Sequence, residues 1–232
     1  MAEQIEVFRD EKKFYITRLE AAVLEKKLSE VLRYDMDGKE YMVRSVYFDD
    51  CFSKDFWATQ YGDLVRKKIR IRCYRPDEDP VKLEVKNKAA DKQLKQTVLI
   101  PAALAREMIS GQYDGLLDLN DKLANEVYYY LKKSSYRPAA TVEYNRSAFV
   151  YDNFSVRITF DSEIKISETD FDIFNEQMLL YPACTSDFVL MELKYNQFLP
   201  EFIKRMLKDS NLVSTAFSKY CMSRVFINEY FF

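Results

Sequence analysis

Two segments of the chain alternate charged and apolar residues so regularly that a β-strand is the regular structure that suits them. In LVRKKIRIRCY the charged row is Arg66, Lys68, Arg70 and Arg72, and in VKLEVKNK it is Lys82, Glu84, Lys86 and Lys88. Successive side chains of a strand point to opposite faces, so each segment also has an apolar face, which carries Ile69, Ile71, Leu83 and Val85. The apolar faces need a core. The charged faces need open water or an anion.

The rest of the chain combines strand and helix signals that predict an antiparallel α+β fold. We expect strands over residues 6–17, 42–49, 64–74, 81–88, 92–100, 137–149, 154–160 and 187–195, with a short continuation at 163–166. We expect helices over residues 17–32, 52–61, 101–111, 119–133, 200–208 and 218–229. Hairpins favour an antiparallel sheet, and about eight strands suffice to close a barrel. A single domain over residues 1–232 accommodates these elements.

The same alternation recurs in four other predicted strands. Residues that share a face are Glu11 with Lys13, Tyr144 with Arg146, Arg157 with Thr159 and Asp161, and Glu192 with Lys194. For any one strand, a half-exposed surface position or a weak cross-strand salt bridge explains the pattern. Together the strands favour a charged interior, because the charges in the two rows described above are nearly all positive. Buried cations need an anion with many oxygens, and carboxylates among them, such as Glu11, Glu84 and Glu192, are suited to Mg²⁺ or Mn²⁺.

What the chain lacks excludes several kinds of chemistry. It has no histidine, which excludes His-based catalytic triads and His-ligated zinc sites. None of its four glycines belongs to a Walker loop or a GxGxxG turn. Phosphates would therefore have to be bound by Lys and Arg side chains. The net charge of −2 does not fit a nonspecific nucleic-acid binder, so we expect no nucleic-acid partner.

The sequence also carries an expectation about location. The four cysteines are widely spaced, no apolar run is long enough to span a membrane, and the first residues lack the apolar core of a signal peptide. We expect a reduced, cytoplasmic protein that does not insert into a membrane. A partner within a membrane and the oligomeric state stay open.

Eight motifs, in order along nearly the whole chain, resemble the VTC domain. This is the polyphosphate polymerase branch of the triphosphate tunnel metalloenzymes, in the CYTH-like superfamily. The motifs are EKKFYI, RSVYFDD, KKIRIRCY, KLEVKNK, VEYNRSAF, VRITFDSEI, VLMELKYN and FSKYCMSR. The resemblance implies an eight-stranded antiparallel β tunnel, or barrel, with helices packed on the outside. Inside it, basic residues bind a triphosphate and a glutamate holds a divalent metal, Mn²⁺ or Mg²⁺.

Carried over by motif, the resemblance implies roles for individual residues. Arg70, Arg72, Lys86, Arg146 and Arg157 would be catalytic contacts to phosphate, Lys13, Tyr144, Lys194, Ser218 and Lys219 would bind substrate, and Glu192 would bind the metal. From the residues alone, Lys219 is more ordinarily a solvated surface charge and Ser218 a helix cap. The tunnel triphosphatases carry an ExExK signature on the first strand, of which RDEKKF supplies only Glu11 and Lys13. That departure favours the polymerase branch.

The leading hypothesis is an ATP-dependent polyphosphate polymerase that transfers the γ-phosphoryl group of ATP to a growing polyphosphate chain and releases ADP. ATP and inorganic polyphosphate would be its partners. Two alternatives stay open: a metal-dependent triphosphatase acting on inorganic triphosphate or a nucleotide, and a noncatalytic module that binds polyphosphate or another polyanion. The number of carboxylates in the tunnel would distinguish the polymerase from the triphosphatase. Turnover would distinguish either enzyme from the binding module.

Overall fold

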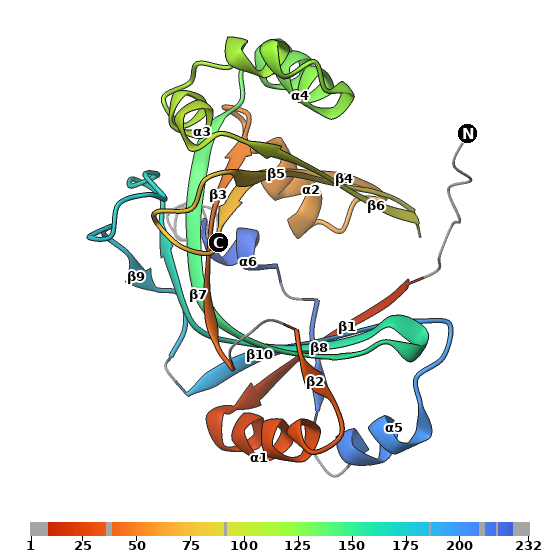
Figure 1. Cartoon of the computed structure of the whole chain (residues 1–232). Coiled ribbons are helices and arrows are strands. Elements are labelled where there is room, and N and C mark those ends of the chain that lie inside the picture. Colours follow the sequence, from red (N-terminus) through yellow and green to blue (C-terminus); the bar gives the residue numbers. More distant parts are fainter. Residues whose placement is uncertain are drawn as a thin grey trace. The chain divides into compact units, whose positions relative to one another are not determined.

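The computed structural model describes residues 9–35, 39–90, 92–185, 187–208, 212–216 and 218–224 (Figure 1). Its paired strands are antiparallel and helices pack on them, which confirms the predicted α+β class. The chain divides into two compact units. The first unit comprises residues 1–41, 144–164 and 184–217, and the second comprises residues 42–143, 165–183 and 218–232.

Eight long strands and three short ones account for the sheet in the described residues. The long strands are β1 (Arg9–Thr17), β3 (Tyr41–Asp49), β4 (Val65–Cys73), β5 (Val81–Ala89), β6 (Lys92–Ile100), β7 (Arg137–Tyr151), β8 (Val156–Ser167) and β10 (Phe188–Asn196). The short strands are β2 (Arg33–Tyr34), β9 (Tyr181–Pro182) and β11 (Val213–Ser214). β7 and β8 contribute residues to both units.

The helices fall where they were predicted, but the last one, predicted over residues 218–229, is shorter, because it ends at Met222 with Ser223 as its C-cap. They are α1 (Arg18–Ser29), α2 (Lys54–Gln60), α3 (Ala102–Ile109), α4 (Lys122–Lys133), α5 (Glu201–Lys208) and α6 (Lys219–Met222), with 3₁₀ turns η1 (Asp114–Leu119) and η2 (Asn153–Ser155). The capping box predicted at Thr17 is present, with Glu20 as its partner. Residues 6–8 and 225–229, parts of the predicted first strand and last helix, lie outside the described residues.

In three places the predicted boundaries were wrong for local reasons. The predicted helix over 119–133 starts at Lys122, because Asn120 is left-handed (φ 50°) and Asp121 caps α4 through the Ala124 amide. The predicted strand at 154–160 starts at Val156, because Phe154 also has a positive φ of 63°. Pro101 precedes α3 as its N-cap instead of forming its first residue.

The second unit packs one face of a sheet against helices α3 and α4 (Figure 1). Its strand order is β7–β3–β4–β5–β6. The apolar residues of the alternating strands form this core, together with residues of both helices: Val46, Phe48, Ile69, Ile71, Leu83, Val85, Leu104, Met108, Val127 and Leu131. The predicted apolar face of residues 66–88 is therefore confirmed, and the charged rows lie on the opposite face of the sheet.

The first unit follows the same plan with different strands. Its order is β11–β1–β10–β8–β7, and helices α1 and α5 cover the apolar face. That core contains Phe14, Ile16, Leu24, Leu28, Ile158, Phe160, Met191, Leu193, Ile203 and Leu207. Each order is open at its outer strand, β11 or β6, in the described residues. Closure of the sheet into a barrel therefore stays a prediction.

The described helices are short. A spanning helix needs about 20 predominantly apolar residues. No helix within the described ranges has the length and hydropathy to cross a membrane.

Candidate functional site

The charged rows of β4 and β5 lie directly opposite each other in the second unit. The register pairs Arg66 with Lys88, Lys68 with Lys86, Arg70 with Glu84 and Arg72 with Lys82. On β3, Ser45 lies opposite Arg72 and Tyr47 opposite Arg70. Directly opposed positions bring side chains within contact distance. The hairpin therefore concentrates seven Lys and Arg residues with a single glutamate in these four pairs.

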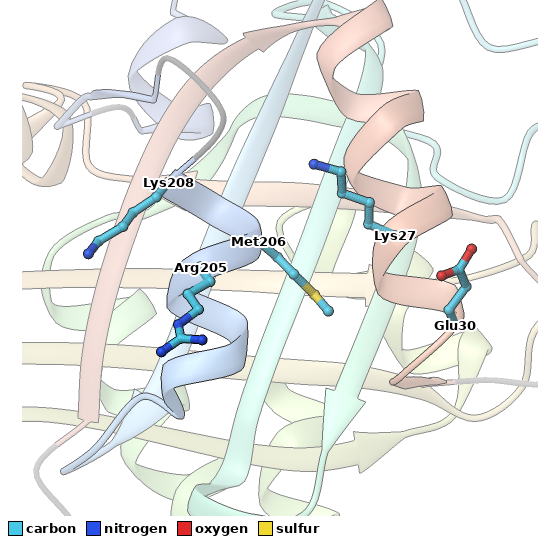
Figure 2. A pocket seen from close by; sticks show the side chains of 5 residues that line it. All are labelled: Lys27, Glu30, Arg205, Met206 and Lys208. Atoms are coloured by element: carbon cyan, nitrogen blue, oxygen red, sulfur yellow. The ribbon is translucent and has the colours of Figure 1, made fainter.

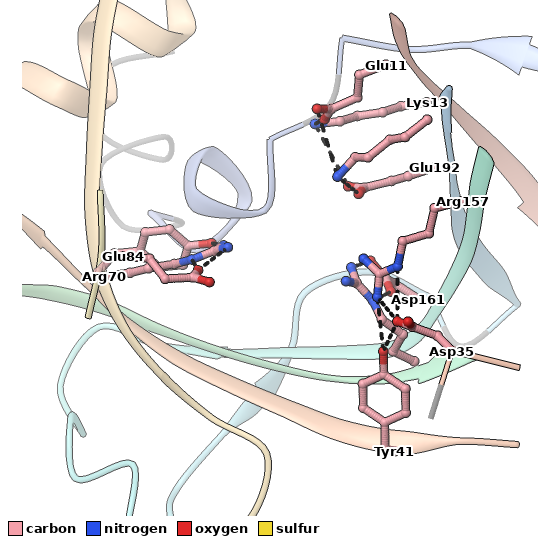
Figure 3. A network of polar contacts seen from close by, with 12 residues as sticks. Glu11, Lys13, Asp35, Tyr41, Arg70, Glu84, Arg157, Asp161 and Glu192 are labelled. Atoms are coloured by element: carbon pink, nitrogen blue, oxygen red, sulfur yellow. Dashed lines mark hydrogen bonds and ion pairs between the residues drawn. The ribbon is translucent and has the colours of Figure 1, made fainter. Parts of the chain in front are cut away.

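Glu84 is the centre of this cationic face. Its Oε2 accepts a hydrogen bond from Arg70 Nε at 2.7 Å and lies 2.6 Å from Arg70 Nη2. Lys95 Nζ lies 2.5 Å from Oε1, and Arg72 Nε lies 3.9 Å from Oε2. Burial would raise the pKa of Glu84, but the charges of Arg70, Arg72 and Lys95 outweigh it and hold that pKa well below its usual range. Figure 3 shows the Arg70–Glu84 pair.

Tyr47 holds Arg70 from the other side. Its hydroxyl accepts a hydrogen bond from Arg70 Nη1 at 2.9 Å, and its ring stacks on Tyr220 of α6 at 5.1 Å. Burial would raise the pKa of Tyr47, yet the nearby cations, Arg70 first, outweigh it and lower the pKa. Arg70 is thus fixed by a carboxylate and a phenol, and its side chain stays 22% exposed.

The residues predicted on the last helix join this face. Lys68 Nζ lies 2.8 Å from Ser218 Oγ, and the same oxygen caps α6 by accepting from the Cys221 amide at 3.3 Å. Lys219 is only 9% exposed, so it is not the solvated surface charge that an isolated lysine near a helix would ordinarily be. Lys86 lines a small cavity of about 30 Å³ together with Tyr47, Lys68, Arg70, Glu84 and Lys95. That volume holds roughly one water molecule, so a phosphate would bind here only by displacing side chains.

A second charged group occupies the polar face of the first unit. β1 and β10 pair Glu11 with Lys194 and Lys13 with Glu192. Lys13 Nζ lies 3.4 Å from Glu11 and 3.9 Å from Glu192, while Lys194 Nζ lies 3.3 Å from Glu192 and 3.9 Å from Glu11. Each ammonium thus lies between two carboxylates, and each carboxylate between two ammonium groups (Figure 3).

Two arginines of the first unit have carboxylate partners of their own. Arg157 on β8 pairs with Asp35 and also donates to the Tyr41 hydroxyl at 3.3 Å. Arg146 on β7 forms a bidentate pair with Asp161, with Nε–Oδ1 at 2.7 Å and Nη2–Oδ2 at 2.8 Å. Both members of the Arg146–Asp161 pair are buried.

The arginine of this buried pair also lies over an aromatic ring. The guanidinium carbon of Arg146 is 5.2 Å from the ring centroid of Tyr144, which is buried as well. Tyr144 therefore packs against Arg146, as their shared strand face predicts.

Comparison with protein-family models decides the family. The model of the VTC domain matches residues 8–227. The chain belongs to the VTC domain family. No curated protein is similar enough in sequence to count as a match to this VTC domain.

Solved structures similar to this VTC domain share little sequence with it. A candidate adenylyl cyclase from Hippeastrum, whose description reports a dominant triphosphatase activity, aligns with a TM-score of 0.56 at 13% identity over 93% of this chain and 96% of its own. A candidate adenylate cyclase from Vibrio parahaemolyticus gives 0.49 at 12% identity, over 93% and 97%. The PH1819 protein of Pyrococcus horikoshii gives 0.48 at 13% identity, over 96% and 99%. At such low sequence identity, the Hippeastrum match supports a shared fold and nothing further.

The divalent metal implied for this family can be tested against the carboxylates present. Within the described residues, no group of three or more His, Cys, Asp or Glu side chains forms a metal cage. Glu11 and Glu192 do share two lysine neighbours on one polar face. Mg²⁺ is commonly bound by one or two carboxylates together with substrate phosphates. A single carboxylate such as Glu192 would therefore suffice for one metal shared with a substrate, and its assignment stays a prediction. The described carboxylates give no support for a second metal.

The residues predicted for this VTC domain fall into two sets, one in each unit. The second unit brings together Arg70, Arg72, Lys86, Ser218 and Lys219, and the first unit holds Lys13, Tyr144, Arg146, Arg157, Glu192 and Lys194. Sequence reasoning had not assigned roles to Tyr47, Lys68 and Lys95, which contact or adjoin the predicted residues. It had considered Glu84 only as a carboxylate suited to a metal, whereas the structure pairs it with Arg70 and Lys95. The signal was present for Lys68 and Glu84, which belong to the alternating rows. Tyr47 alternates with Val46 and Phe48, which also places it on the polar face.

Proposed function

We propose that this VTC domain is an ATP-dependent polyphosphate polymerase that transfers the γ-phosphoryl group of ATP to a polyphosphate chain and releases ADP. The observation that carries the proposal is the register of β4 and β5, which gathers Lys68, Arg70, Arg72 and Lys86 on one partly buried face. Gathering like charges away from water is costly unless an anion compensates them. Phosphoryl transfer asks mainly for positioning and charge neutralisation, which such a face supplies.

The reaction balances without a protein base. A terminal oxygen of the polyphosphate chain forms a bond to the γ-phosphorus, and the bond from that phosphorus to the β–γ bridging oxygen breaks. ADP leaves with the bridging oxygen. Because the attacking oxygen is already ionised at neutral pH, no proton has to be removed, and a chain without histidine can perform the step.

In this proposal each unit supplies phosphate contacts. Arg70, Arg72 and Lys86 of the second unit neutralise charge on the transferred group, helped by Ser218 and Lys219. In the first unit Lys13, Tyr144, Lys194, Arg146 and Arg157 bind phosphates. Asp161 already occupies Nε and Nη2 of Arg146, so a phosphate contact from that side chain falls to its Nη1. A divalent metal held by Glu192 would supply further charge neutralisation between phosphate oxygens.

The proposal includes two features of architecture. The eight long strands would close into the tunnel that the family implies, with basic residues lining it. Residues 1–232 would act as one functional domain, in keeping with a family match that runs without interruption over residues 8–227.

A triphosphatase is the second candidate, and one specific observation favours it. The similar structure from Hippeastrum is described as having a dominant triphosphatase activity. Water would then replace the polyphosphate end as the acceptor. A noncatalytic polyanion-binding module is the third candidate and predicts binding without turnover, weakened by salt.

Product analysis distinguishes the three candidates. The purified protein is incubated with ATP and Mn²⁺, and long-chain polyphosphate, ADP and free phosphate are resolved. The polymerase predicts long polymer with ADP. Free phosphate or triphosphate without polymer would contradict the polymerase and support the triphosphatase. The absence of all products, together with tight polyphosphate binding, would support the binding module.

A matched pair of variants ties the activity to the cationic face. Arg70→Ala should lower turnover by at least about 100-fold, the usual effect of removing one preorganised donor from a charge-stabilising site. Arg75→Ala is the control, because that side chain is 73% exposed and pairs only with Asp77 among the contacts seen for it. Full activity in Arg70→Ala would refute the role given to β4.

A further inference from the structure

Three partly exposed phenylalanines lie near one another in the first unit. Phe154 in η2, Phe198 after β10 and Phe202 in α5 are 49%, 48% and 37% exposed. The rings of Phe154 and Phe198 meet edge to face at 5.5 Å, and Phe202 meets Tyr151 at the same distance and in the same manner. We call these four residues the aromatic patch. Because they form contacting pairs on two neighbouring segments, they differ from the singly scattered apolar residues of ordinary surfaces.

The backbone beneath the patch is unusual. Phe154 has φ 63°, its neighbour Ser155 has φ 48°, and Gln197, next to Phe198, has φ 56°. Positive φ is disfavoured for residues other than glycine, and most strongly for bulky ones. Such conformations tend to persist where a site uses them. Both turns of the patch therefore present a phenylalanine from strained backbone.

Basic side chains border the patch along α5 and α1. Lys204 Nζ lies 4.8 Å from the Phe198 ring centroid, and the Arg205 side chain is 78% exposed. Arg205 and Lys208 line an open hollow of about 480 Å³ with Lys27, Glu30 and Met206 (Figure 2). Glu201, which pairs with Lys204 and Arg205, and Glu30 offset only part of this charge. The cations named here outnumber the acids by four to two.

We propose that the aromatic patch and the bordering cations form a docking surface for a lipid bilayer with anionic headgroups. Phenylalanine rings enter the boundary between headgroups and acyl chains, and Lys and Arg beside them are attracted to anionic lipid. Long lysine side chains can keep their ammonium groups at the headgroups while the rings lie deeper. A protein partner is the poorer fit, because lysine is depleted from protein interfaces. This contact is peripheral and reversible, and it does not depend on the function proposed above.

Vesicle co-sedimentation tests the proposal. The full chain is mixed with vesicles of phosphatidylcholine alone and of phosphatidylcholine with phosphatidylserine. We expect binding to the anionic vesicles, weak binding to the neutral ones, and weaker binding as salt is raised. Absence of binding to anionic vesicles, or equal binding to both compositions, would overturn the proposal.

Variants connect the binding to the patch. Phe154→Ser with Phe198→Ser should weaken vesicle binding by at least about tenfold, given the cost of losing two buried aromatic rings. Lys204→Glu with Arg205→Glu should also weaken vesicle binding, and this variant tests the charge while leaving every aromatic residue in place. Phe52→Ser is the matched control, because Phe52 is 81% exposed on the second unit. If Phe52→Ser weakens binding equally, the patch is not the docking surface.

The rival occupant is a second copy of the chain. It would appear as a concentration-dependent dimer in sedimentation velocity that the Phe154→Ser, Phe198→Ser variant loses, with no binding to vesicles. That result would overturn the bilayer as the occupant.

Discussion

Arg70 on β4 directs two of its guanidinium nitrogens at one carboxylate oxygen of Glu84 on β5, at 2.7 and 2.6 Å. The carboxylate is almost wholly buried, and it also lies near Arg72 and Lys95. One anion therefore compensates three cations on a face that the proposed function assigns to phosphate. A phosphate arriving there would meet donors whose positions Glu84 fixes, and it would enter by displacing side chains that line the small cavity.

Replacing Glu84 should destabilise the protein strongly. Glu84→Gln keeps the shape but leaves three cations without their anion, and breaking a buried ion pair in this way costs about 3–5 kcal/mol. Glu126→Gln, which loses an exposed pair with Lys122, should change the free energy of unfolding by less than about 0.5 kcal/mol. Urea unfolding at neutral pH measures both. Equal stability of the two variants would contradict the central position given to Glu84.

Removing the carboxylate of Glu192 should alter the dependence of activity on metal. In Glu192→Gln we expect the Mn²⁺ concentration for half-maximal activity to rise by at least about tenfold, the effect typical of a weakened metal ligand set. Glu11→Gln, on the paired strand, should have a smaller effect, because only Glu192 is assigned to the metal. Titration of Mn²⁺ followed by electron paramagnetic resonance gives binding without relying on turnover. Unchanged Mn²⁺ binding in Glu192→Gln would remove that residue from the metal site.

The buried carboxyl of Asp55 predicts a pH dependence of stability. Burial, with the nearby charge of Asp49, raises the pKa of Asp55 to about 6, although the Tyr136 hydroxyl donates to it at 2.8 Å. Because the pKa of Asp55 is higher in the folded chain than in the unfolded chain, where it is about 3.9, protonated Asp55 favours the folded state. This stabilisation is fully present below the unfolded-state pKa and is lost as the pH rises through about 6. The loss amounts to about 3 kcal/mol for a shift of this size.

Asp55→Asn cannot ionise and should escape this loss. Its stability relative to the native chain should therefore rise between pH 4 and pH 7, as measured by urea unfolding at several pH values. Asp118→Asn, at an exposed position, should show no such trend. A constant difference between Asp55→Asn and the native chain across that range would show that Asp55 does not titrate there.

Two bidentate arginine–aspartate pairs of the first unit should differ greatly in how much each pair contributes to the free energy of unfolding. Arg146–Asp161 is buried, whereas the side chains of Arg33–Asp152 are 61% and 77% exposed. A double-mutant cycle measured by urea unfolding should give a coupling of about 3 kcal/mol or more for the buried pair and a far smaller one for the exposed pair, which water and salt screen. Similar couplings would mean that burial of Asp161 does not strengthen the pair.

The charged faces were predictable because the period of a β-strand is short and strict. Ile69, Ile71, Leu83 and Val85 alternate with charges, and that alone predicts which side of each strand meets the core. The capping box at Thr17 was equally local, since both partners lie within four residues. Which segments form strands, and where most helices and strands begin and end, could be predicted from such short-range signals.

The partners of the charged residues were not predictable in the same way. Asp161 lies on a different strand from Arg146, and which residues meet depends on the register set by the η2 turn. That turn contains Phe154 in a conformation that its residue type gives no reason to expect. The burial of Lys219 likewise depends on packing of α6 and not on local sequence.

One contact within the second unit bears on the order in which the cationic face can form. Asp49, at the end of β3, accepts from the amides of Asp55 and Phe56 at the start of α2 and from the hydroxyl of Tyr220, which is 171 residues further along the chain. A nascent chain could pair β4 with β5 early, since their residues are close in sequence. It would still lack the ring that stacks on Tyr47 and the Ser218 hydroxyl beside Lys68 until α6 has been synthesised. The β4–β5 register that gathers the cations therefore depends on contacts close in sequence, whereas the stacking ring and the hydroxyl that complete their surroundings come from the last described helix.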